Sequence, residues 1–479
     1  MKPTLEQENI VKEFPNVQML KINACAGSGK SSTLKLLAQA NPNKSLYVAF
    51  NKAIAEEAKE SFPSNVECRT THSLAFAKYG KMLMHKLNRP KGGYVNVAGT
   101  PAEIAKYYNI PPFYDGQWDV QEKTVASVVK EAVKLYEQSA DTEIDRKHIP
   151  YRRVSEIANS REGFNKSLFV DTCLSYAVKL WKDRIDVHTN VLATHDTYLK
   201  LYQLSKPKLS YDIIYLDESQ DTNPTVLDIV MNQTHAKVAF VGDSFQSIYA
   251  FRGAINAMDQ IQCPTMYLTK SFRYGQPIAD VATAIINGEM DIEGNETIDS
   301  VVGVVNLDNP YTMLFRTNGE LLSQASRLIS EGVEISCEID TNDYRKLITS
   351  AVALFEGRYK DVKHDSIIPY QTWNDLLDNQ KEEPELKRTA NIVMNNPDEF
   401  ISNLDSMKKQ KDAHVTLTTA HKSKGRQWDQ VMLADDFADV ENGVIAEQER
   451  NLLYVAATRA VNVLQTNSTC DDLISGGGG

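Results

Sequence analysis

Two regions of the chain alternate short apolar runs with stretches of helical periodicity. In the first region the apolar runs cover residues 19–24, 45–50, 66–70, 213–216 and 237–241. In the second region they cover residues 301–307, 313–315, 415–419 and 431–433, with helices predicted over 321–329 and 448–457. Strands that alternate with helices are typical of a parallel sheet covered by helices on both faces. The pattern therefore predicts two α/β units in tandem.

Both units are interrupted by segments longer than ordinary connections between neighbouring elements. Residues 81–208 separate two parts of the first sheet, and residues 337–410 interrupt the second unit. Helical patterns over 125–136 and 168–181 predict that the first insert is mostly helical. The predicted boundaries are a first domain of residues 1–80 and 209–275, its insert of residues 81–208, a second domain of residues 276–336 and 411–474, its insert of residues 337–410, and a flexible tail of residues 475–479.

The composition is that of an ordinary globular protein. Hydrophobic residues make up 42% of the 479 residues, and 52 basic against 63 acidic residues give a formal net charge of −11. This acidity does not exclude nucleic acid as a partner, because a local basic groove is enough to bind it. No segment is apolar enough for a membrane span or a signal peptide. The six cysteines are scattered without a CxxC pair, which indicates neither zinc nor a disulfide framework. We expect a reducing compartment: the cytoplasm of a bacterial or phage-infected cell, or a nucleus.

A glycine-rich loop follows the first predicted strand and precedes a predicted helix. Small residues there let backbone N–H groups surround a phosphate, and the helix N-terminus adds a favourable dipole. The predicted phosphate-binding residues are Ala26, Gly27, Ser28, Gly29, Lys30, Ser31 and Ser32. Lys30 is expected to reach the β- and γ-phosphates, and Ser31 to ligate Mg²⁺. The alternative is a glycine-rich turn before an ordinary helix.

A second candidate segment is the acidic end of the predicted strand 213–216. It reads Asp217-Glu218-Ser219-Gln220-Asp221. Ligand sites of α/β sheets lie at the carboxyl ends of the strands, so both leading acids are expected near the glycine-rich loop. We predict that Asp217 holds Mg²⁺ through its water shell and that Glu218 orients or deprotonates the attacking water. Alone, such a strand end is usually a turn; together with Lys30 it predicts NTP hydrolysis, with ATP and Mg²⁺ as cofactors.

Six segments resemble, in order, five motifs of the UvrD/Rep group of superfamily 1 helicases. Residues 217–221 resemble motif II, 241–254 motif III, 268–273 with 315–318 the motif IV region, 418–425 motif V and 449–460 motif VI. Residues 50–55 and 71–75 are similar to the motor of the F-box DNA helicases, although no F-box segment precedes them here. The resemblance implies two RecA-like parallel-sheet motor domains in tandem, each interrupted by a mostly helical insert, with ATP between them.

The resemblance also implies roles for residues around the nucleotide. Gln246 would sense the γ-phosphate and couple it to the DNA site. Arg273 and Arg459 would stabilise the phosphoryl transition state from around the cleft between the domains. Gln7 would read the adenine, although Thr4 to Gln7 equally fits a capping box at the start of a helix.

The sequence departs from the family pattern at three places. Ala24 stands where the first glycine of the phosphate loop usually lies. Ser244 and Phe245 stand where motif III commonly has Thr-Asp. Gln427 stands where many relatives have a glutamate that holds the ribose, and it can bind a hydroxyl only as a neutral group.

Contacts to DNA are implied in the same way. The predicted DNA-binding residues are Asn51, His72, Tyr249, Phe251, Arg252 and His421. Phe251 matches the aromatic that stacks on a base, a contact that tolerates any base and contributes about 1–3 kcal/mol. The alternative is that the aromatics belong to the core and the histidines are structural. Basic residues that follow His72 are either a phosphate track or a solvated face: Lys78, Lys81, His85, Lys86, Arg89 and Lys91.

The function implied by the resemblance is ATP-dependent DNA unwinding by translocation on single-stranded DNA in the 3′→5′ direction. Expected partners are single strands, single-strand/duplex junctions and replication or recombination proteins. Two alternatives remain at this point. A translocase that strips proteins such as recombinase filaments from single strands would use the same motor. A regulatory switch that uses ATP only for a conformational change would need no strand-binding aromatic.

Overall fold

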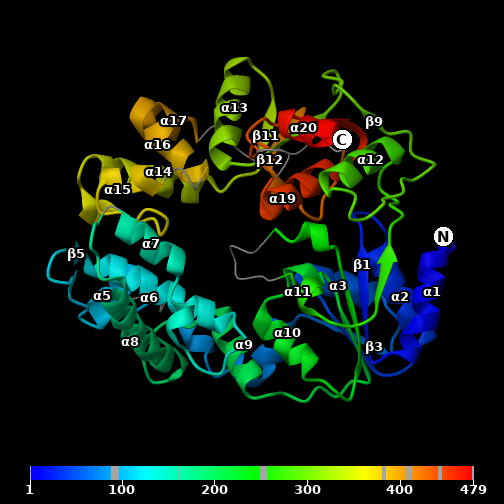
Figure 1. The fold of residues 1–479 in the computed structure, drawn as a ribbon, viewed down its shortest axis with the longest axis horizontal. Helices are drawn as coiled ribbons and strands as arrows, with labels where there is room; N and C mark the ends of the chain where they lie inside the picture. Colours follow the sequence, from blue (N-terminus) through cyan, green and yellow to red (C-terminus); the bar gives the residue numbers. More distant parts are fainter. Residues whose placement is uncertain are drawn as a thin grey trace.

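The computed structural model describes residues 2–87, 97–159, 161–248, 256–379, 384–404, 407, 413–440 and 445–476. Its core consists of two six-stranded sheets, and every strand pairing within them is parallel. Figure 1 shows the N-terminal sheet in blue and green below the C-terminal half of the chain. The predicted fold of two parallel-sheet α/β domains is confirmed.

The first sheet has the strand order β3-β2-β6-β7-β1-β8. Its strands are β1 (Met19–Ala24), β2 (Ser45–Val48), β3 (Val66–Arg69), β6 (Ile213–Leu216), β7 (Lys237–Gly242) and β8 (Thr265–Leu268). Its helices are α1 (Leu5–Glu13), α2 (Lys30–Ala40), α3 (Lys52–Ser61), α4 (Thr71–Ala75), α10 (Pro224–Met231) and α11 (Ala257–Gln260). Because β7 lies between β1 and β6, the segment after β7 is placed between the glycine-rich loop and the acidic strand end.

The second sheet has the order β11-β12-β10-β13-β14-β9. Its strands are β9 (Val301–Val302), β10 (Tyr311–Phe315), β11 (Ile335–Cys337), β12 (Val415–Thr419), β13 (Trp428–Leu433) and β14 (Ala460–Gln465). Its helices are α12 (Gln276–Ile285), α13 (Asn318–Ser330), α18 (Ala420–Ser423), α19 (Glu447–Ala457) and α20 (Ser468–Gly476). One core buries α12, α19 and α20 against the sheet, and it extends to Cys25 and Ala26 of the glycine-rich loop. The two domains therefore share buried apolar contacts next to that loop.

Several predicted elements differ from the structure. Strands β8, β11 and β14 were not predicted, because none of them contains a long apolar run and their neighbours in the sheet define them. The predicted strand over 301–307 is wrong beyond Val302. There the chain leaves the ladder, and the N–H of Val305 donates to the side chain of Gln465 at 3.1 Å. The predicted tail starts too early, since α20 continues to Gly476.

The two inserts are mainly helical in their described residues. The first contains α5 (Pro101–Tyr107), the hairpin β4 (Phe113–Tyr114) and β5 (Asp119–Val120), α6 (Glu122–Glu137), α7 (Tyr151–Asn159), α8 (Lys166–Ile185) and α9 (His195–Leu204). The second contains α14 (Thr341–Phe355), α15 (Trp373–Asn379), α16 (Pro384–Asn395) and α17 (Pro397–Asn403). Within the described part of the chain, no helix is both long and apolar enough to cross a membrane.

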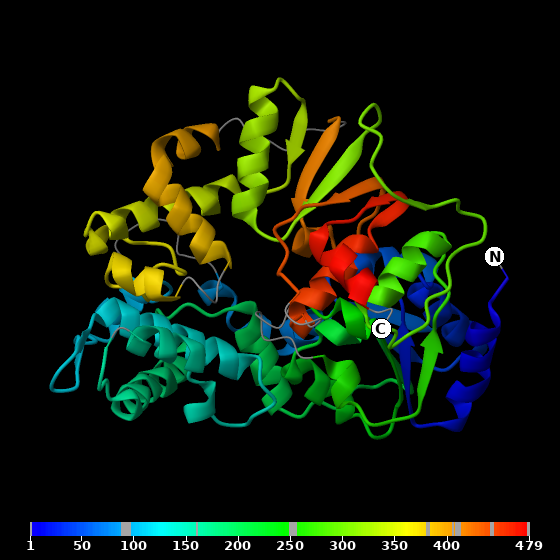
Figure 2. The same ribbon diagram turned by 45° about the horizontal axis from the view of Figure 1, so that its top comes forward.

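The inserts pack against each other on the side away from the two sheets (Figures 1 and 2). Buried Arg161 of the first insert pairs with Asp375 of the second at 3.3 Å. Asn159 donates to Asn379 at 2.9 Å, and the hydroxyls of Thr124 and Tyr359 lie 2.8 Å apart. The domains and their inserts therefore meet at two separate places, one beside the glycine-rich loop and one between the inserts.

Candidate functional site

The glycine-rich loop joins the end of β1 to the start of α2. Gly27 and Gly29 have φ angles of 80° and 81°, the left-handed region that glycine adopts without strain. A Cβ at Gly27 would lie 2.7 Å from the Cβ of Arg273, so a side chain there would also displace the neighbouring segment. Lys30 is the first residue of α2, and Ser31 and Ser32 follow it with exposed side chains. The loop therefore has the conformation and the free helix N-terminus that phosphate binding requires.

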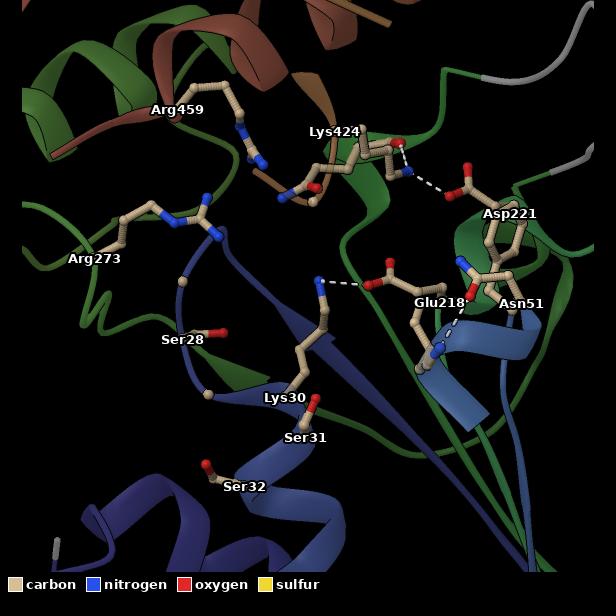
Figure 3. Close-up of a pocket in the computed structure, with 16 residues that line it drawn as sticks. Ser28, Lys30, Ser31, Ser32, Asn51, Glu218, Asp221, Arg273, Lys424 and Arg459 are labelled. Carbon is tan, nitrogen blue, oxygen red and sulfur yellow. Dashed lines mark hydrogen bonds and ion pairs between the residues drawn. The ribbon is translucent and has the colours of Figure 1, made fainter. Parts of the chain in front are cut away.

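A pocket of about 420 Å³ opens over this loop between the two domains (Figure 3). It is lined by Gly27, Ser28, Gly29, Lys30, Ser31, Ser32, Phe50, Asn51, Ile54, Glu218, Asp221, Gln246, Arg273, Lys424, Gly425 and Arg459. Most of the residues predicted for phosphate binding and hydrolysis come together here. Ala26 and Asp217 lie buried behind the pocket wall.

Two carboxylates at the end of β6 form the acidic side of the site. Glu218 has a φ of 49°, a conformation that costs a non-glycine residue about 1–3 kcal/mol and is often kept at functional sites. Its Oε1 lies 3.8 Å from the Nζ of Lys30, and its Oε2 accepts a hydrogen bond from Gln220 at 2.5 Å. Buried Asp217 accepts hydrogen bonds from the Tyr47 hydroxyl at 2.5 Å and from the N–H of Glu218 at 2.9 Å.

The ionisation of this group of side chains follows from burial and mutual charge. Burial and then the charge of Glu218 raise the pKa of Asp217, whereas Lys30 and Lys424 outweigh burial and lower the pKa of Glu218. Burial opposes the charge of Lys30 as well, but Glu218, Asp243 and Asp217 more than compensate and raise its pKa. Glu218 therefore stays ionised to lower pH than Asp217, so it can accept a hydrogen bond from a water molecule that it orients.

The donor set fits a Mg²⁺ ion bound together with a nucleotide. Among the described residues, no group of three or more acidic, histidine or cysteine side chains could hold a metal by itself. Mg²⁺ is commonly held by one or two protein oxygens, waters and substrate phosphates rather than by an all-protein cage. Ser31 and Asp217 would supply the protein oxygens, and a bound Mg²⁺ would contribute positive charge beside the phosphates.

The two predicted arginine fingers both extend from around the cleft. Arg273 follows β8, and its guanidinium donates to Gln427 at 3.0 Å and to the carbonyl of Thr458 at 2.9 Å. Arg459 follows α19, is buried, and donates to the carbonyl of Val455 at 2.7 Å. Burial, followed by the charge of the neighbouring Arg273, lowers the pKa of Arg459 to about 9. An anion in the pocket would offset the repulsion between the positive charges of Arg273 and Arg459.

The predicted adenine and ribose residues lie at the edge of the site. Gln7 forms the capping box with Thr4, and its Nε2 also donates to Thr33 of α2 at 3.0 Å. The capping interpretation and a position beside the phosphate loop are therefore compatible. Gln427 is exposed and bound to Arg273 rather than directed freely at the pocket. Phe272 was not predicted, but its ring lies 3.5 Å from where a Cβ of Gly29 would stand, so it flanks the loop beside Gln7.

A cross-domain ion pair is the main feature that the sequence did not indicate. Lys424, in the loop after α18, pairs with buried Asp221 and donates to the carbonyl of Gln246 at 2.6 Å. Gln246 itself donates to Asp243 at 2.7 Å. Lys424 and Asp221 were part of the recognised motifs, yet no local signal distinguishes their side chains from ordinary surface charges.

A second groove, of about 1010 Å³, runs along α3, α4 and α9 and contains two of the predicted DNA contacts. The α3–α9 groove is lined by Phe50, Asn51, Lys52, Ala55, Glu56, Lys59, Cys68, Arg69, Thr70, His72, Ser73, Phe76, Ala77, Lys81, His195 and Tyr198. Four of these side chains are lysine or arginine and one is glutamate, so the groove is locally basic within an acidic chain. Asn51 lines both the pocket over the glycine-rich loop and this groove.

The remaining DNA predictions have different outcomes. His421 lies on α18 of the second domain, outside the α3–α9 groove. Tyr249, Phe251 and Arg252 lie outside the described residues. The predicted basic track is wrong at Lys86, which is buried and donates to the carbonyl of Asp183 and to Thr189. Burial lowers its pKa to about 8, which is typical of a structural lysine rather than a phosphate contact.

Comparisons with known proteins define the class of this fold and site. Residues 4–261 match the UvrD/REP helicase N-terminal domain, and residues 414–462 match the UvrD-like helicase C-terminal domain. The chain belongs to the UvrD/Rep helicase family, and the resemblance found in its motifs is confirmed.

Individual relatives show how much of the chain is matched and at what identity. The chain is 32% identical to F-box DNA helicase 1 of Gallus gallus, over 99% of this chain and 50% of the relative. It is 31% identical to F-box DNA helicase protein 1 of Schizosaccharomyces pombe, over 98% of this chain and 58% of the relative. A shorter match, 36% over 92 residues, is to the ATP-dependent DNA helicase PcrA of Leuconostoc citreum, covering 18% of this chain and 12% of that protein. The chain thus spans about half the length of the two F-box relatives.

Proposed function

We propose that this protein is an ATP-dependent DNA helicase that translocates 3′→5′ on single-stranded DNA. The observation that carries the proposal is the composition of one pocket. Lys30 and Glu218 of the first domain face it together with Lys424 and Arg459 from the second. A nucleotide bound there would interact with both domains at once, so binding and hydrolysis would change how the domains sit relative to each other.

The proposed chemistry assigns one role to each group. The loop amides and Lys30 bind the phosphates, Glu218 orients the attacking water, and Arg273 and Arg459 stabilise the charge on the transferred phosphoryl group. Gln246 would report the state of the γ-phosphate, since its backbone carbonyl accepts a hydrogen bond from Lys424 and its side-chain amide donates one to Asp243. Phe272 and Gln7 would flank the base.

The proposed path of the strand on the first domain is the α3–α9 groove. Its excess of basic side chains suits a phosphate backbone, and Phe50, 48% exposed at its end, offers a surface on which a base can stack. His72 faces this groove and is held by Asp196 at 3.1 Å. Asn51 would connect the strand to the nucleotide pocket, because it borders both.

The experiment that tests this proposal combines two assays on the whole chain. ATPase activity is measured with and without single-stranded DNA, and unwinding is measured on duplexes with only a 3′ or only a 5′ single-stranded tail. We expect DNA-stimulated hydrolysis and unwinding from the 3′ tail. The second insert is small, so we expect strong translocation and modest unwinding by a lone monomer.

Each alternative has its own result in these assays. Preferential unwinding from the 5′ tail would refute the proposed direction. Strand-stimulated ATPase without unwinding, but with removal of a recombinase filament, would favour a protein-stripping translocase. ATPase that does not respond to DNA would favour a regulatory switch.

The proposal also covers the domain boundaries, the partners and the cellular compartment of the protein. We propose the domain boundaries given by the sequence, except that the second domain extends to the end of α20 at Gly476. The proposed partners are single strands, junctions and replication or recombination proteins. Such a protein would act in DNA replication, recombination or repair, in a nucleus or in the cytoplasm of a bacterial or phage-infected cell.

A further inference from the structure

Tyr454 is a buried side chain of the second domain that reaches the phosphate loop of the first. It lies on α19, five residues before Arg459, and its side chain is fully buried. Its ring meets that of Phe245 edge-on, with centroids 5.8 Å apart, in the segment that follows β7. Tyr454 therefore sits where the glycine-rich loop, the segment after β7 and α19 come together.

The hydroxyl of Tyr454 makes two hydrogen bonds that only a group able to donate and accept can make together. It accepts from the backbone N–H of Ala26, in the phosphate loop, at 3.0 Å. It donates to the Oδ2 of Asp243 at 3.2 Å. Both partners are fully buried, so neither bond can be replaced by one to bulk water.

Asp243 extends this connection to the hydrolytic residues. Its Oδ2 also accepts from Gln246 at 2.7 Å, and its N–H donates to the side chain of Gln220 at 3.1 Å. Gln220 in turn donates to Glu218. One phenol oxygen thus joins the phosphate loop, through Asp243, to the residues proposed to sense the γ-phosphate and to act on water.

We infer that Tyr454 is a positioning residue that holds the Ala26 peptide, and with it the phosphate loop, in the shape that binds nucleotide. A phenylalanine would fill the same space but would leave the Ala26 N–H without its partner. The inference rests on the proposed function, since it assumes that this loop binds phosphates. ADP is the ligand for testing this inference, because it has no γ-phosphate and its binding depends on the phosphate loop.

The test compares wild-type protein with Tyr454→Phe by calorimetric titration with ADP and Mg²⁺. Loss of a buried hydrogen bond that leaves one partner unsatisfied predicts about a tenfold weaker affinity. We expect a similar rise in KM for ATP, with kcat at saturation changed less than KM. The matched control is Tyr274→Phe, which removes another fully buried phenol from the same core. In the described part of the chain, that phenol makes no hydrogen bond to Ala26 or Asp243 within ordinary bonding geometry.

Hydrogen exchange at the Ala26 amide provides a measurement that ordinary core packing would not affect. In wild-type protein without nucleotide, this amide should exchange slowly, and in Tyr454→Phe it should exchange faster while α19 stays protected. Rapid exchange of Ala26 in the wild-type protein would overturn the inference without any variant. A drop in Tm with unchanged ADP affinity and unchanged exchange would overturn it as well.

The outcomes also separate this inference from the proposed function. Absence of ADP binding by the wild-type protein would overturn the proposed function and the inference together. Normal ADP binding by both proteins would overturn only the inference. A fall in kcat with KM and ADP affinity unchanged would also overturn it, because Tyr454 would then act on Arg459 rather than on the loop.

Discussion

Lys424 of the second domain and Asp221 of the first form an ion pair across the nucleotide pocket, with the Lys424 ammonium also bound to the carbonyl of Gln246. The side chain of Asp221 is 1% exposed and that of Lys424 is 11% exposed. The pair joins the domains directly, and in the proposed function it lies where the γ-phosphate would bind. An incoming phosphate would compete with Asp221 for the ammonium, which makes the pair a natural point of coupling between the domains.

The first prediction concerns the pH dependence of stability at Asp221. Burial, the largest cause, raises its pKa from 3.8 to about 6 despite Lys424. The folded state therefore retains the proton to higher pH, and this stabilisation is present below about pH 4 and lost as the pH rises through 6. Asp221→Asn removes this pH dependence. The Tm of the variant minus the Tm of the wild type should therefore rise between about pH 4 and about pH 6. The free energy of unfolding of the variant, relative to wild type, should increase by at most about 3 kcal/mol over this pH range. A constant difference in Tm from low to neutral pH would contradict the assignment.

The second prediction is that Lys30→Ala abolishes ATP hydrolysis and leaves the fold intact. Lys30 begins α2 next to the left-handed Gly29 and is the cation that faces Glu218 across the pocket. Steady-state ATPase and circular dichroism measure the two parts of the prediction. Lys35→Ala is the matched control, because Lys35 lies on the same helix and its ammonium stacks on Phe62 instead. Normal turnover in folded Lys30→Ala protein would refute the proposed phosphate site.

The third prediction separates the two acids at the end of β6. Glu218→Gln should bind ATP and Mg²⁺ normally and hydrolyse about 10²–10⁴-fold more slowly, because the attacking water loses its base. Asp217→Asn should instead weaken the affinity for Mg²⁺, so that activity requires a higher Mg²⁺ concentration, since Asp217 is the proposed ligand. Nucleotide binding and Mg²⁺ titrations distinguish the variants. Loss of nucleotide binding in Glu218→Gln would show that Glu218 serves the structure of the site or retains the metal.

The fourth prediction is that Phe251→Ala reduces DNA stimulation of the ATPase and unwinding more than it reduces basal hydrolysis. Stacking acts on the strand and not on the phosphates, and its loss should weaken DNA binding by about 1–3 kcal/mol. The assay is ATPase with and without single-stranded DNA, beside unwinding of a tailed duplex. Phe251→Trp keeps a stacking surface and is the control. Unchanged unwinding in Phe251→Ala would assign Phe251 to the core or to a redundant role.

The sequence by itself determined the two parallel-sheet domains and the contiguous parts of the site. The positions of Lys30, Ser31, Asp217 and Glu218 could be predicted because each follows a strand within a short motif, and strand ends in a parallel sheet share one edge. Their roles in binding and hydrolysis are proposals. The capping box at Thr4 was visible for the same reason, since it depends only on residues three apart.

Only the tertiary structure decided the contacts between distant segments. The bonds from Tyr47 to Asp217, from Lys424 to Asp221 and from Ala26 to Tyr454 join residues 170 or more positions apart. The same holds for the packing of the two inserts. Such pairs depend on strand order and domain placement, and a buried tyrosine or lysine has no local pattern that names its partner. Local sequence fixes backbone geometry, whereas long-range partners follow from how the finished elements pack.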